Sequence, residues 1–292
     1  MIYVIRTAFF VAFTCVALTA QAEPSLHQVS KLIWSQTDPW FGGFSGAEVT
    51  ANGTDITLIT DKGSLVTATM LRENGVLTAL KLRGHVLLTP TVRVSSESFE
   101  LDAEGLAMDA HGHAFVSFEQ DHRVEQVDLD SARILGALTT TEFVDLQDNS
   151  GLEALAVHPD GTLYTLPERS GMIDTPFPVF THVGGEWHVA HHIPRRGPFL
   201  PVGADFSDDG LFYLLERAVT PLGFRSRIRR FDLAAPDLDE EVLLTTGPGQ
   251  FDNFEAISIW RDMSGQTFVT LVSDDNFLPI QQTQIVEFAL EE

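Results

Sequence analysis

The sequence predicts an all-β fold, a β-propeller with five blades. Five related segments recur at intervals of about 50 residues, which is the length of a blade of four short strands. Alternating runs separated by glycine-containing turns indicate strands, and no long stretch has the 3.6-residue period of a helix. The same chain could also be divided into six blades, one of them poorly marked, and this alternative stays open.

Each unit begins with two strands joined by a tight turn and continues with further strands. In the second unit, Leu106 and Met108 share one face of the first strand, whereas Gly105 and Ala107 share the other. Small residues suit the crowded axis of a propeller, and large apolar residues pack between blades. We expect strands at residues 104–109, 114–118, 123–129 and 134–143 in the second unit, and at 153–157, 162–166, 178–183 and 187–193 in the third.

The two ends of the chain are predicted to share the last blade. The last unit contains only three strands, the third at residues 284–290, whereas residues 26–34 form a strand-like run without a partner in the first unit. If this N-terminal run completes the last blade, the ring closes and leaves no open sheet edge.

Residues 1–22 are predicted to be a signal peptide. Arg6 precedes a short apolar stretch that ends in Ala20-Gln21-Ala22, a small-residue cleavage pattern. An uncleaved N-terminal anchor is the alternative, although the stretch is short for a membrane span. Cleavage would leave a single domain, residues 23–292, with no membrane span and without the only cysteine, Cys15. We therefore expect an exported protein, periplasmic or extracellular.

The chain is strongly acidic. It has 41 Asp and Glu against 18 Lys and Arg, which gives a formal net charge of −23 over 292 residues. Because 44% of the residues are hydrophobic and only 20% are charged, this acidity does not indicate disorder. The charge argues against a nucleic acid or an anionic membrane as partner. We expect a monomer that binds cations, or substrates that carry cations.

Each unit has one acidic residue on its first strand and another near the end of its second strand. Because the start of one strand of a hairpin lies beside the end of the other, we expect both acids of every unit at the same mouth of the central channel. The pairs are Glu48 and Asp61, Glu104 and Glu119, Glu153 and Glu168, Asp205 and Glu216, and Glu255 with Asp274 or Asp275.

Ten converging carboxylates would repel one another unless some were protonated or a cation lay among them. Oxygen ligands without cysteine favour a hard ion, with Ca²⁺ as the first choice and Mg²⁺ or Mn²⁺ as the second. Asn253 and Asn276 could add neutral oxygen ligands. In the alternative interpretation, the acids accept backbone amides and form ion pairs with Lys62, Arg123, Arg169 and Arg217.

Four short motifs follow one another along the chain: GLEALA at residues 151–156, LLER at 214–217, NFEAI at 253–257 and LVSDDNF at 271–277. Together they resemble the phytase-like domain family, also called "esterase-like activity of phytase" proteins, over residues 42–290. The resemblance implies an exported propeller that hydrolyses a phosphoester or an ester. Established propeller phytases hold Ca²⁺ in acidic clusters at the channel, where it binds substrate phosphates. Lys62 is the only lysine that we place there, and a single lysine is a poor match for a substrate as highly phosphorylated as phytate.

Two classes of function stay open. The first is a Ca²⁺-dependent hydrolase of a phosphoester, carboxyl ester or lactone. In it, Glu104 or Glu153 would act as the base, and Arg169 and Arg217 would stabilise the anionic product. The second is an exported propeller without catalytic activity that binds a ligand or a protein partner, with a purely structural metal.

Overall fold

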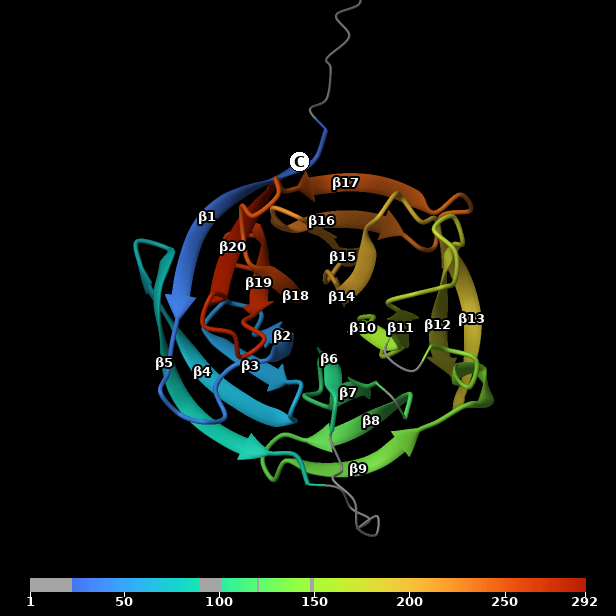
Figure 1. The fold of residues 1–292 in the computed structure, drawn as a ribbon, viewed down its shortest axis with the longest axis horizontal. Coiled ribbons are helices and arrows are strands. Elements are labelled where there is room, and N and C mark those ends of the chain that lie inside the picture. Colours follow the sequence, from blue (N-terminus) through green and yellow to red (C-terminus); the bar gives the residue numbers. More distant parts are fainter. Residues whose placement is uncertain (1–22, 90–100, 120, 148–149) are drawn as a thin grey trace, which may run out of the picture.

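Five four-stranded blades form a ring around a central axis (Figure 1). The structure is a computed structural model that describes residues 23–89, 101–119, 121–147 and 150–292. The predicted signal peptide, with Cys15, lies outside the described residues. Among the described residues, no helix is long and apolar enough to cross a membrane. The prediction of a five-bladed propeller is confirmed, and the six-bladed alternative is wrong.

In the first four blades, the strands follow one another from the channel outwards, and each strand is antiparallel to its neighbour. The first blade contains β2 (Phe44–Val49), β3 (Asp55–Thr60), β4 (Ser64–Glu73) and β5 (Val76–Leu87). The second contains β6 (Ala103–Met108), β7 (Ala114–Phe118), β8 (Arg123–Asp128) and β9 (Arg133–Leu138). The third contains β10 (Leu152–Val157), β11 (Leu163–Pro167), β12 (Phe177–Val183) and β13 (Glu186–Ile193). The fourth contains β14 (Leu200–Phe206), β15 (Phe212–Thr220), β16 (Gly223–Asp232) and β17 (Asp239–Thr245).

The fifth blade joins the two ends of the chain. It contains β18 (Asn253–Arg261), β19 (Thr267–Asp274), β20 (Thr283–Glu291) and, outermost, β1 (Ser25–Trp34). β1 pairs antiparallel with β20, from Ser25 opposite Glu291 to Trp34 opposite Thr283. The prediction that the N-terminal run completes the last blade is therefore confirmed.

One predicted strand is shorter than expected. β9 ends at Leu138, and the 3₁₀ turn η1 (Thr141–Phe143) replaces the end of the strand predicted at 134–143. The Thr140 side chain accepts a hydrogen bond from the backbone N–H of Glu142 and so caps this turn. The turn brings Phe143 into the core between blades.

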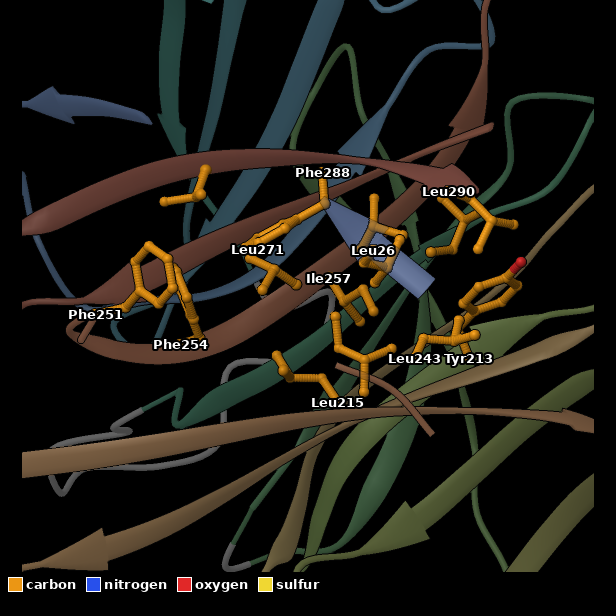
Figure 2. Packing of buried hydrophobic residues seen from close by; sticks show 14 of the residues in the cluster. Leu26, Tyr213, Leu215, Leu243, Phe251, Phe254, Ile257, Leu271, Phe288 and Leu290 are labelled. Carbon is orange, nitrogen blue, oxygen red and sulfur yellow. The ribbon is translucent and has the colours of Figure 1, made fainter. Parts of the chain in front are cut away.

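The hydrophobic core lies between neighbouring blades. Tyr213 and Leu215 of β15 belong to the same buried cluster as Ile257 of β18 and Phe288 of β20 (Figure 2). Burial of such side chains contributes about 1.5–3 kcal/mol each. Similar clusters occur between the other blades, so each blade is held by its two neighbours.

The innermost strands approach so closely that the channel is nearly closed partway along. A Cβ atom added to Gly46 would lie 2.6 Å from the backbone nitrogen of Leu106, and one added to Gly105 would lie 2.7 Å from the Cβ atom of Leu155. The free volume at this level is about 10 Å³, roughly the space of one water molecule. We call this constriction the waist, and it gives the channel two separate mouths.

Every innermost strand also has a β-bulge near its start. The pairing with the second strand shifts at Ser45 in β2, Glu104 and Gly105 in β6, Glu153 in β10, Val202 in β14 and Glu255 in β18. A bulge takes the extra residue out of the regular alternation of the strand and re-aims its side chain. The same local irregularity therefore recurs at one level around the ring.

A buried ion pair connects the fifth blade to the first. Glu287 of β20 is fully buried and accepts hydrogen bonds from Arg72 of β4, with an Nη1–Oε2 distance of 2.7 Å, and from Ser30 of β1, at 2.9 Å. The Arg72 guanidinium also lies 4.9 Å from the centre of the Trp260 ring. Arg72 thus neutralises a carboxylate that water does not reach.

We expect the substitution Arg72→Ala to lower the free energy of unfolding by about 3–5 kcal/mol, because it leaves the Glu287 charge buried and unpaired. Urea denaturation measures the effect. The matched control is Arg83→Ala, whose side chain is 55% exposed and pairs with Asp55, and which should change stability by less than about 1 kcal/mol. Equal decreases in the free energy of unfolding of the two variants would contradict the role of this ion pair in joining the blades.

Candidate functional site

A group of carboxylates and one arginine converges at the mouth where the innermost strands begin. We call it the acidic mouth. Its members come mainly from two places in each blade, the bulge of the innermost strand and the end of the second strand. They are Asp61, Asp102, Glu104, Glu119, Glu153, Glu168, Glu255, Asp274 and Arg217.

The bulge positions supply three glutamates that influence one another's charge. They are Glu104 in β6, Glu153 in β10 and Glu255 in β18. Glu153 and Glu255 also line the waist, so they lie at the floor of the acidic mouth. In the other two blades, the bulge residues are Ser45 and Val202, which carry no charge.

The ends of the second strands supply the other side chains. The backbone N–H groups of Asp61, Glu119 and Glu168 donate to carbonyls just before or at the start of the innermost strand, at 2.8, 2.9 and 2.9 Å. Asp274 occupies this place in the fifth blade and Arg217 in the fourth. The fourth blade therefore provides a cation where the others provide a carboxylate.

Arg217 bridges carboxylates from two neighbouring blades. Its side chain is 17% exposed and forms ion pairs with Glu168, at 3.1 Å, and with Glu255. It also donates to the side-chain oxygen of Asn253, at 2.9 Å. Burial lowers the pKa of Arg217, but the charges of Glu255, Glu153 and Glu168 outweigh burial and raise that pKa above its usual value. Arg217 is therefore a fixed positive charge.

The other carboxylates are not neutralised to the same extent. Burial, and then the charge of Glu153, raises the pKa of Glu104 well above its usual value, and burial followed by Glu255 does the same for Glu153. Burial and Glu255 raise the pKa of Asp274 to about 8, and burial raises that of Asp61 to about 6. The acidic mouth thus holds more carboxyl groups than Arg217 can neutralise, and burial together with their mutual repulsion favours their protonated forms.

Three of these residues could share a metal ion. One carboxylate oxygen from each of Asp102, Glu104 and Glu119 lies within 4.8 Å of the others. Nearby, Oδ1 of Asp61 is buried and has no hydrogen-bond partner among the described residues. A set of carboxylate oxygens is the ligand type that Ca²⁺, Mg²⁺ and Mn²⁺ prefer, so these residues fit a hard divalent cation.

Two residues at this mouth were not found from the sequence. Asp102 lies two positions before Glu104, outside the repeated pattern, and it has a φ angle of 26°, which is unusual for a residue with a side chain. His122 lies in the β7–β8 connection, and its ring lies against Gly151. Both of its ring nitrogens are buried without a hydrogen-bond partner among the described residues. Neither residue has a counterpart in every unit.

Glu48 and Asp205 do not lie at the acidic mouth, so the prediction that all ten acids share one mouth is wrong. They lie near the ends of β2 and β14, whereas Glu104, Glu153 and Glu255 lie near the starts of their strands. An alignment of the units on their acidic residues makes Glu48 and Asp205 equivalent to the three glutamates, but the pairing register makes Ser45 and Val202 the true equivalents. Glu48 and Asp205 line the opposite end of the channel, which we call the far mouth.

Glu216 is also placed differently from the prediction. It directly precedes Arg217 in β15, so its side chain points to the opposite face of the strand. It is fully buried and accepts hydrogen bonds from Nε of Arg227 and Nη2 of Arg229, both at 2.6 Å. Glu216 is thus part of a buried ion-pair cluster between β15 and β16.

Of the two predicted neutral ligands, Asn253 already uses its side chain in hydrogen bonds. Asn253 donates its side-chain N–H to Glu255, at 2.8 Å, and accepts from Arg217. Asn276 donates its backbone N–H to Oδ1 of Asp274, at 2.7 Å. Arg169, a half-exposed residue beside the acidic mouth, forms an ion pair with Glu168 at 3.2 Å.

Comparison with known proteins identifies a family. A sequence profile described as "Phytase-like: Esterase-like activity of phytase" matches residues 39–277. No curated protein sequence matches. Among solved structures, the PQQ-bound form of an aldose sugar dehydrogenase from Streptomyces coelicolor is 11% identical, with 93% of this chain and 99% of that chain covered and a TM-score of 0.48. A luciferin-regenerating enzyme is 10% identical, with 91% and 95% covered and a TM-score of 0.48. Because the profile covers most of the chain, from before β2 to beyond β19, the protein belongs to the phytase-like family.

Proposed function

We propose that the protein is an exported, metal-dependent hydrolase that cleaves a phosphoester or an ester at the acidic mouth. The observation that supports this proposal most strongly is the group formed by Asp102, Glu104 and Glu119, whose oxygens lie within 4.8 Å of one another. Membership of a family described by its esterase-like activity supports the choice of a hydrolase.

The ligand set favours Ca²⁺, with Mg²⁺ or Mn²⁺ as alternatives. Asp102, Glu104 and Glu119 would hold the ion, because each offers a carboxylate oxygen to the same space. When bound, a divalent cation supplies Lewis acidity to a phosphoryl or carbonyl oxygen and to a water molecule. Three protein carboxylates leave coordination positions for substrate and water, since Ca²⁺ takes six to eight oxygen ligands.

The remaining side chains have separate tasks in this proposal. Glu153 lies beside the metal ligands, and burial and then the charge of Glu255 raise its pKa. In its ionised form it would therefore be a stronger base than an exposed carboxylate and could accept a proton from the attacking water. Arg169 is half-exposed and can bind the anionic part of the substrate or product. Arg217 holds Glu168 and Glu255 in place and limits the repulsion around Glu153.

A non-catalytic propeller with a structural metal is the second candidate. The raised pKa values of Glu104 and Glu153 reflect burial before any other cause, and buried carboxylates also suit an ion that only stabilises the ring. The two candidates agree that a cation binds and differ in whether a substrate is turned over.

We expect Ca²⁺ to bind the purified protein, to raise its melting temperature, and to support hydrolysis of nitrophenyl phosphate, a nitrophenyl ester or a lactone. Calorimetric titration and absorbance assays measure these effects. The substitution Glu104→Gln should weaken Ca²⁺ binding and reduce hydrolysis about 100-fold or more, because it removes a ligand. Glu186→Gln, at a side chain 81% exposed on β13, is the control and should leave both unchanged.

The outcomes separate the candidates. If EDTA lowers the melting temperature but no substrate is hydrolysed, the protein binds a structural metal and the hydrolase proposal fails. If EDTA does not change the melting temperature and Glu104→Gln gives the same Ca²⁺ titration as the unmodified protein, the proposed metal site is wrong.

Stability in EDTA should fall as the pH rises from about 5 to about 8. The pKa values of Asp61, Asp205 and Asp274 are raised in the folded protein to about 6, 7 and 8, so the folded state binds more protons than the unfolded state in this range. The stabilisation is complete below the unfolded pKa values, near 4, and is lost as the pH passes the folded ones. Ca²⁺ should therefore raise the melting temperature more at pH 8 than at pH 5.

Thermal melts across this range, with EDTA or with Ca²⁺, measure both trends. A melting temperature that rises with pH in EDTA, or a Ca²⁺ effect that is the same at both ends of the range, would contradict this account of the carboxylates.

A further inference from the structure

The far mouth contains a cavity of about 510 Å³ that the proposed hydrolase does not use. The waist, with a free volume of about 10 Å³, separates it from the acidic mouth. Its walls are largely apolar and include Met108, Val157, Phe206 and Ile259. A cavity of this size and character is within the range that binds small organic molecules.

Two carboxylates lie in this cavity and are held in fixed positions. Glu48 accepts a hydrogen bond from the backbone N–H of Met108, at 3.1 Å, and Asp205 accepts one from that of Ile259, at 2.6 Å. The hydroxyl of Ser258, which accepts a hydrogen bond from the backbone N–H of Val49 at 2.9 Å, interacts with both carboxylates and lowers the pKa of each. Asp205 is only 6% exposed. These contacts come from neighbouring blades, so the rigid ring sets the positions of both carboxylates.

No basic side chain of the described residues forms an ion pair with Glu48 or Asp205. The basic residues at the rim of the cavity are already engaged: Arg261 pairs with Asp208 at 2.9 Å and with Asp209 at 3.1 Å, and His158 pairs with Asp160 at 2.9 Å. The carboxylates in the cavity therefore lack a positive partner within the described part of the chain.

The pKa values of Glu48 and Asp205 agree with their lack of a positive partner. Burial, and then the charge of Asp205, raises the pKa of Glu48 well above its usual value, and burial raises the pKa of Asp205 to about 7. Desolvation thus disfavours the ionised forms of Glu48 and Asp205. A positive group placed between the two carboxylates would stabilise these ionised forms.

We propose that the far mouth is a second binding site, which takes a small organic cation. The ligand is an amine whose ammonium group lies between Glu48 and Asp205 and whose apolar part contacts Met108, Phe206 and Ile259. A divalent metal fits less well, because two carboxylates and apolar walls do not supply the six to eight oxygens that Ca²⁺ takes. An anion would meet two carboxylates, and a neutral apolar molecule would leave them without a partner.

Benzylamine is a suitable probe, with benzyl alcohol as its neutral counterpart of similar shape. In calorimetric titrations of the full protein in EDTA near neutral pH, benzylamine should bind with an affinity about tenfold or more above that of benzyl alcohol, because only the amine carries the charge. EDTA removes divalent ions from the acidic mouth and keeps this test separate from the proposed hydrolase.

Four variants locate the binding. Glu48→Gln and Asp205→Asn should each weaken benzylamine binding about tenfold or more. Asp208→Asn, at an exposed rim carboxylate, should change it by less than about threefold. Glu104→Gln, at the acidic mouth, should bind benzylamine like the unmodified protein. Circular dichroism and melting temperature establish that each variant is folded, and Glu48→Gln alone carries the test if Asp205→Asn does not fold.

Three results would overturn the proposal. They are equal binding of benzylamine and benzyl alcohol, undiminished benzylamine binding by folded Glu48→Gln, and no measurable benzylamine binding at millimolar concentration. The second of these results, together with loss of binding in Glu104→Gln, would place the amine at the acidic mouth.

Discussion

Mutual repulsion among buried carboxylates determines what the acidic mouth can bind. The blades converge on one axis, and three of them place a glutamate at the same bulge position of the innermost strand. Arg217 neutralises Glu168 and Glu255, but no described arginine or lysine forms an ion pair with Glu104 or Glu153. Burial raises the pKa of both of these glutamates. The site is consequently suited to a proton or a metal ion, and a change of pH would exchange one for the other.

A propeller can hold such a site because its stability comes from elsewhere. Apolar clusters between blades surround the channel, and the pairing of β1 with β20 connects the two ends of the chain. Buried carboxylates away from the mouths are matched by arginines: Glu216 by Arg227 and Arg229 of the neighbouring strand, and Glu287 by Arg72 of the first blade. Carboxylates with a structural role are thus paired with arginines, whereas most of the described carboxylates at the two mouths form no ion pair with a described arginine.

The sequence was sufficient to predict the fold and part of the site. A period near 50 residues, glycine turns and an unpaired N-terminal run defined five blades and their closure, since these features depend on local pattern. Glu104 with Glu119, and Glu153 with Glu168, were located because the hairpin spacing is regular in those units. Glu48 and Asp205 were misplaced because the acidic residue in these two strands lies three positions after the bulge residue, Ser45 or Val202, and so near the other end of the strand. Glu216 was misplaced because it directly precedes Arg217 and therefore faces the opposite side of β15. Asp102 and His122 lie in connections outside the repeat, where only tertiary contacts reveal them.

The proposed hydrolase requires a divalent cation between Asp102, Glu104 and Glu119. The most direct measurement is anomalous diffraction from crystals of the protein grown with Mn²⁺ and with Ca²⁺. The account predicts an anomalous peak at the acidic mouth, about 2.0–2.6 Å from carboxylate oxygens of these three residues. Crystals at saturating metal with no peak there, or with peaks only at other places on the molecule, would contradict it.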